Sequence, residues 1–92
     1  MNTKQAINIA QGCLLWLVNN PDELTHFMQA SGSSIDDLKQ RGSDPEFLGF
    51  IMDFVMMDDR WVMAAAAEND VPPETLAQAK SSLPGGENPW WT

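Results

Sequence analysis

The chain has 92 residues, 43% of them hydrophobic, and a formal net charge of −8 at pH 7. This length fits one small domain with a single core, and no apolar run approaches the roughly 20 residues that cross a bilayer. Five basic residues spread along the chain cannot neutralise a phosphate track, which argues against nucleic acid as a partner. A single cysteine, Cys13, excludes an internal disulfide and agrees with a reducing, cytoplasmic setting.

A proline followed by an acid, any residue and a leucine occurs three times, beginning at Pro21, Pro45 and Pro73. Proline loses nothing at the first helical position, because its missing N–H would be unpaired there, and the acid meets the positive end of the helix dipole. Each occurrence therefore predicts a helix start. The whole chain is predicted to be all-α, a compact orthogonal bundle of five or six short helices.

The first helix is expected over residues 3–18, where apolar side chains recur at helical spacing along one broad arc. Cys13 lies in the middle of this arc, so we expect its thiol to be buried and unreactive. Leu15 is the exception, because the same spacing puts it on the polar side of the helix.

The second helix is expected over residues 21–31, with Asn20 as its cap. A short third helix follows a pair of serines, with Ile35 and Leu38 as its inward-facing pair. Gly42 is the predicted end of this helix, in the left-handed conformation that glycine adopts easily.

The fourth helix is expected over about residues 45–57, capped by Asp44, and its sequence is apolar almost all round. Only Glu46, Gly49 and Asp53 interrupt the apolar surface, and we interpret them as a narrow stripe that faces solvent. A helix that is apolar on nearly every side must be surrounded by other helices. We therefore expect it to be the central element of the bundle.

A fifth helix is expected over residues 60–69, where several alanines allow a neighbouring helix to approach closely, and a sixth over about residues 73–83. A Pro-Gly-Gly sequence then ends the regular structure. We predict one helical domain over residues 1–84, followed by a flexible tail over residues 85–92 that carries two adjacent tryptophans.

Several short sequences match the pattern of a known family. They are Ser31-Gly32 through Asp36-Asp37-Leu38, Asp44-Pro45-Glu46-Phe47-Leu48, Asp53-Phe54, Asp58-Asp59, Pro73-Glu74 and Leu83-Pro84-Gly85. In these features the chain resembles a bacterial family of short helical proteins catalogued as domain of unknown function 3572. The resemblance implies a compact all-α fold and supplies no activity, ligand or catalytic residue.

One spacing is typical of a metal site. Glu23 and His26 have the Glu-x-x-His arrangement of di-iron bundles, which need two such pairs and two further glutamates. This chain has one histidine, so only a symmetric dimer would supply the second pair. We therefore expect no metal, no cofactor and no enzymatic activity, and we keep a metal-binding or enzymatic site around Glu23 and His26 as a third alternative.

The candidate partner-binding residues are large apolar side chains on an exposed edge of the first helix, on a Met/Trp-rich face around the fourth and fifth helices, and in the tail. They are Leu15, Trp16, Met56, Met57, Trp61, Trp90 and Trp91. Methionines adapt to a partner's shape, and tryptophans in a polar tail cost solubility unless they dock on the domain or on another molecule. We therefore predict a protein–protein interaction or regulatory adaptor module that binds another protein or a second copy of itself. The alternative is a homodimeric structural domain without a ligand; neither a membrane nor a small molecule is expected as a partner.

Overall fold

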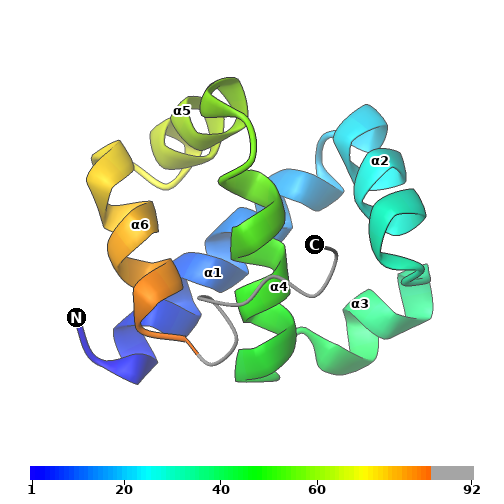
Figure 1. Ribbon diagram of the computed structural model, residues 1–92, viewed down its shortest axis with the longest axis horizontal. Coiled ribbons are helices and arrows are strands. Elements are labelled where there is room, and N and C mark those ends of the chain that lie inside the picture. Colours follow the sequence, from blue (N-terminus) through cyan, green and yellow to red (C-terminus); the bar gives the residue numbers. More distant parts are fainter. Residues whose placement is uncertain (84–92) are drawn as a thin grey trace.

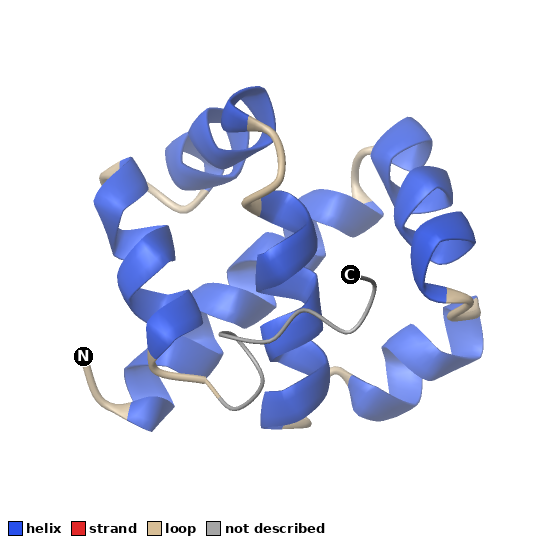
Figure 2. Ribbon diagram, in the orientation of Figure 1, coloured by secondary structure: helices blue, strands red, loops and turns tan. Residues whose placement is uncertain are grey.

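All three proline sequences begin helices in the computed structural model, which describes residues 1–83. The described chain folds into six helices connected by short turns, as Figures 1 and 2 show. The helices are α1 (Thr3–Val18), α2 (Pro21–Ser31), α3 (Ile35–Arg41), α4 (Pro45–Val55), α5 (Asp59–Glu68) and α6 (Pro73–Ser81). The predicted all-α fold is confirmed. None of the helices within residues 1–83 combines the length and the apolar character that a membrane crossing requires.

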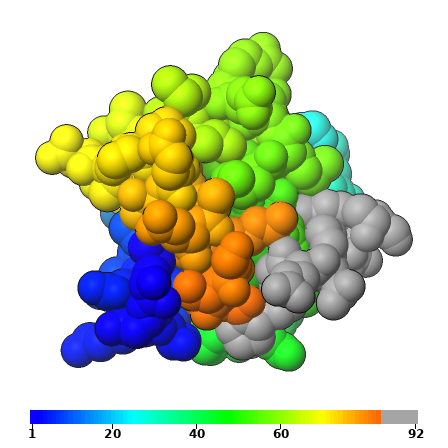
Figure 3. Space-filling view, turned by 60° about the vertical axis from the view of Figure 1, so that its left-hand side comes forward, coloured from blue at the N-terminus to red at the C-terminus, as the bar shows by residue number. Residues whose placement is uncertain are grey.

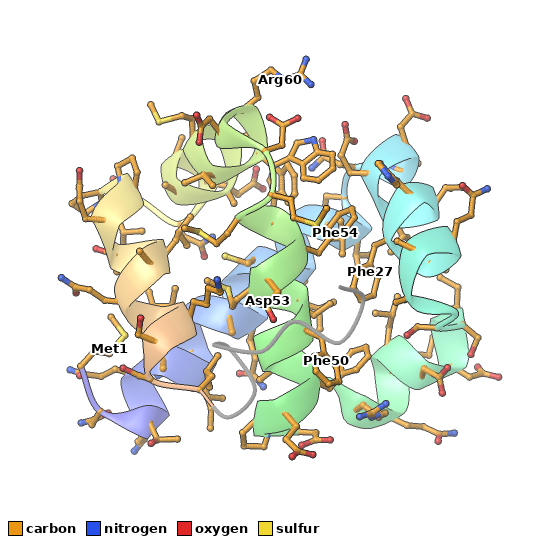
Figure 4. The ribbon with its side chains drawn as sticks, in the orientation of Figure 1. Met1, Phe27, Phe50, Asp53, Phe54 and Arg60 are labelled. Carbon is orange, nitrogen blue, oxygen red and sulfur yellow. The ribbon has the colours of Figure 1, made fainter. Side chains whose placement is uncertain are left out.

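The predicted central position of the fourth helix is confirmed. Eight of the 11 residues of α4 are buried. In Figure 1 this helix crosses in front of α1, with α5 and α6 on one side and α2 and α3 on the other. Phe27 of α2 and Phe54 of α4 point toward one another in Figure 4, and their ring centroids lie 5.2 Å apart. The helix ends at Val55, two residues earlier than expected, because the chain turns at Met56 and Met57 before α5 begins.

Two predicted helix ends are wrong in detail. Asn20 precedes α2, but its side chain makes no capping hydrogen bond; its Nδ2 instead donates to the carbonyl of Trp16 at 2.6 Å. Gly42 keeps a right-handed conformation with φ −64°, and its carbonyl accepts a hydrogen bond from Gln11 Nε2 at 3.0 Å. The left-handed glycine is Gly32, with φ 73°, which ends α2. The turn after α3 is therefore held by a hydrogen bond from the Gln11 side chain of α1, and not by a left-handed glycine.

The predicted solvent-facing stripe on α4 is also wrong. Gly49 and Asp53 are buried, whereas only Glu46 of the three is exposed. The reason is that α6 packs against α4 on this side and brings Lys80 to Asp53. Figure 3 shows α6 between the start of α1 and the residues of α4 and α5.

Candidate functional site

The ends of α1 and α3 form an apolar groove of about 150 Å³. Leu14 and Val18 of α1 line one side, and Ile35, Leu38 and Lys39 of α3 line the other. Leu38 is buried, while Val18 and Ile35 are exposed at the mouth. Aliphatic side chains therefore remain accessible to a partner at this groove.

Leu15 extends the apolar surface beside the groove. Its side chain is 64% exposed, as its place on the polar side of the first helix predicted. Leu15 and Val18 are three residues apart on α1, and residues at this spacing are neighbours on a helix surface. We call this surface the α1–α3 face. It comprises Leu14, Leu15, Val18, Ile35, Leu38 and Lys39.

The few charged side chains around the α1–α3 face all come from α3. The side of the face that α1 supplies has none, because residues 5–21 contain no charged side chain. On α3, Lys39 lines the groove and Asp36 is exposed one turn earlier. The face is thus an apolar surface with one cation, Lys39, and with the anion Asp36 next to it on α3, in a chain of net charge −8.

Two sequence predictions for this part of the molecule are wrong. Ile35, expected to face inward, is 44% exposed, because it stands at the first position of a short helix that packs more loosely than the others. Trp16, predicted as part of an exposed edge, is 4% exposed. Its side chain follows the arc of Cys13 and Leu17 into the core, so Trp16 is unavailable to a partner.

The other predicted partner-binding residues lie around the turn between α4 and α5. Met57 is exposed, whereas Met56 and Trp61 are half-buried and pack against the core. The Trp61 ring stacks on Phe54, with centroids 4.7 Å apart and planes 20° apart. Trp61 is therefore committed largely to the core. The predicted residues Trp90 and Trp91 lie outside the described residues.

The His26 ring packs in an aromatic cluster with Phe54 and Trp61. Its ring meets the rings of Phe54 and Trp61 edge-on, at centroid distances of 5.4 and 5.6 Å. Within residues 1–83, no three histidine, cysteine, aspartate or glutamate side chains gather closely enough to hold a metal ion. Burial raises the pKa of the Cys13 thiol to about 12, so it stays protonated and is a poor nucleophile at neutral pH.

An ion pair between α4 and α6 was not predicted from the local sequence patterns. Asp53 is 3% exposed, its Oδ1 lies 3.3 Å from Lys80 Nζ, and neither of its oxygens accepts a hydrogen bond from the described residues. Figure 4 shows Asp53 in the middle of α4. Burial raises the pKa of the Asp53 carboxyl, and Lys80 opposes this rise. Asp53 belongs to no group of three or more histidine, cysteine, aspartate or glutamate side chains within residues 1–83 that could hold a metal ion.

A second depression, of about 510 Å³, lies where α1 begins beside α6. It is lined by Met1, Gln5, Asn8, Ile9 and Gln78. No acidic, basic or nucleophilic side chain is among these residues. Its mixed amide and aliphatic lining gives a partner fewer apolar anchors than the α1–α3 face, which is therefore the better candidate site.

Fold and surface together describe a small all-α domain with an apolar face and, within residues 1–83, no cluster of side chains that could hold a metal ion. The family described as "Protein of unknown function (DUF3572)" matches residues 3–86, so the chain belongs to this family. The resemblance stated from the sequence is confirmed. Comparisons with curated proteins and with solved structures found no match.

Proposed function

We propose that this protein is a protein–protein interaction module that binds its partner through the α1–α3 face. The observation that supports the proposal is the groove itself, whose apolar walls remain exposed beside the exposed side chain of Leu15. Exposed apolar surface costs free energy in water, at about 25 cal/mol per Å². Where such side chains gather around a concavity, they mark interaction sites.

The shape of the face favours it over the turn between α4 and α5. Binding energy at protein interfaces concentrates in a few side chains that fill pockets and lose their water. The groove between α1 and α3 supplies such a pocket, with Leu38 at its floor. At the turn, Met56 and Trp61 are already packed against the core and leave less surface for a partner.

The proposal includes a non-catalytic role in the cytoplasm. Its support is the chemistry of the titratable groups: a buried, protonated Cys13, a His26 ring held among aromatic side chains, and Asp53 paired with Lys80. An unpaired thiol agrees with a reducing compartment.

The test places a photo-crosslinking amino acid at position 15 of the full chain in living cells. Position 63 is the matched control, because Met63 is also helical and is 60% exposed, close to the 64% of Leu15. We expect illumination to attach protein to position 15 and much less to position 63. An absence of adducts at position 15, or equal adducts at both positions, would contradict the proposal.

A further inference from the structure

We infer that the partner of the α1–α3 face is a second copy of this chain, in a dimer with two-fold symmetry. This inference rests on the proposed function, since it names the occupant of the same face. It is supported by three properties of the face: where it lacks charge, how its apolar side chains are arranged, and how its two charges are placed.

The first property is the neutral surface of α1. Two copies of a chain with net charge −8 repel each other, so they associate best where their surfaces carry no charge. Residues 5–21 form the longest stretch without a charged side chain, and Leu15 and Val18 lie within it on the surface. A strongly basic partner would find fewer acids to pair with here than at the acidic starts of the other helices.

The second property is that the face carries both a projection and a hollow. A two-fold interface requires the same surface to be complementary to itself, so that one residue of each copy contacts another of its partner. Leu15 projects beside a groove lined by Val18 and Ile35. In the proposed dimer, Leu15 of each copy enters the groove of the other and is buried there.

The third property is the pair of charges on α3. Lys39 lines the groove, and Asp36 stands three residues earlier on the same exposed side of the helix. We place the two-fold axis perpendicular to α3, so that the two copies of the helix run in opposite directions and Lys39 of each copy lies opposite Asp36 of the other. The edge of the face is therefore complementary to itself in charge as well as in shape.

Sedimentation equilibrium of the purified full chain tests this dimer between about 1 µM and 1 mM, the range of weak to moderate association. We expect the mass of the wild type to rise with concentration from 10.2 kDa toward twice that value. Leu15→Glu should remain monomeric over the range. Met63→Glu, which adds the same charge at an equally exposed helical position, should dimerise like the wild type.

Charge reversal tests the arrangement without touching the apolar residues. Lys39→Asp and Asp36→Lys should each weaken dimerisation at least several-fold, because each sets like charges opposite one another. The double variant should recover most of the loss, because it restores opposite charges. Circular dichroism establishes that each variant remains helical, and these two surface changes keep the test informative if Leu15→Glu unfolds.

A wild type that stays monomeric up to 1 mM would overturn the inference, as would equal dissociation by Met63→Glu. Failure of the double charge variant to recover association would overturn the two-fold arrangement. The crosslinking experiment distinguishes a failure of the dimer inference from a failure of the proposed function. Adducts with a different protein, together with a monomeric chain, would leave the interaction module standing and remove the dimer, whereas no adducts would remove both.

Discussion

Helix α4 and the α1–α3 face are both rich in apolar side chains, yet one is core and the other surface. Phe54 and its neighbours on α4 are fully buried, because α1, α5 and α6 all pack against this helix. Ile35 remains exposed because α3 packs loosely, and Leu15 remains exposed because it lies on the side of α1 that faces away from the buried arc of Cys13 and Leu17. The contrast shows that apolar content alone does not separate core from binding surface. The side of the helix on which a residue lies, and how tightly that helix packs, decide whether it is buried.

The largest expected effect breaks the core side of this comparison. Phe54→Ala removes a ring that contacts Phe27 and Trp61, so we expect a loss of about 3–5 kcal/mol in the free energy of unfolding. Denaturant titration of the far-ultraviolet dichroism measures this loss. A change below 1 kcal/mol would mean that α4 is not the centre of the core.

The next effect concerns the one charged residue buried on α4. Replacing a buried ion pair by apolar side chains is often neutral or stabilising by about 1–4 kcal/mol, whereas a single partner left buried is costly. Asp53→Leu replaces only the buried carboxylate, by an apolar side chain of similar shape. Because the Lys80 side chain is 30% exposed and can turn to water, we expect a gain at the lower end at pH 7. A loss of stability at pH 7 would show that the ion pair holds α6 on α4.

The stability difference between Asp53→Leu and the wild type should depend on pH, and the pKa of Asp53 sets its direction. The pKa of Asp53 is raised in the folded protein, so the folded state holds the proton more tightly than the unfolded state does. The stability that comes from protonated Asp53 is complete below the ordinary pKa of 3.8 and is lost as the pH rises through the raised pKa. The advantage of Asp53→Leu over the wild type should therefore grow from pH 4 to pH 7. Paired urea titrations at the two pH values would contradict this if the advantage shrank.

A smaller effect concerns how α4 begins. Asp44 Oδ1 accepts a hydrogen bond from the backbone N–H of Glu46 at 3.1 Å. Removing this cap by Asp44→Ala should cost about 0.5–2 kcal/mol, less than the loss of Phe54. A thermal midpoint equal to that of the wild type would show that the proline at the next position suffices to start the helix.

The smallest effect belongs to the surface side of the comparison. Leu15→Ala should change the stability of the monomer by no more than about 0.5 kcal/mol, because the side chain is largely in water. Denaturant titration of dilute protein, where the chain is monomeric, measures this directly. A loss near that of Phe54→Ala would place Leu15 in the core and remove it from the binding surface.

Local signals predicted most of the fold. Proline with a following acid set the starts of α2, α4 and α6, and helical spacing placed Cys13 inside, because both depend only on residues a few positions apart. The burial of Asp53 was missed, since it depends on Lys80, which is 27 positions away and on another helix.

The candidate site was predicted less well than the fold. Leu15 was identified from its position opposite the apolar arc, whereas the exposure of Ile35 was missed and that of Trp16 was predicted wrongly. A groove between α1 and α3 depends on the angle and looseness of helix packing, which spacing along one helix does not encode.

Hydrogen exchange of the purified chain at low and high concentration tests the central claim most directly, because it reports every segment at once. The account predicts that residues 11–18 and 35–41 exchange more slowly at high concentration, while α4 exchanges equally slowly in both. Protection gained around residues 57–63, or no change in any segment, would contradict the assignment of the α1–α3 face as the surface where two copies meet.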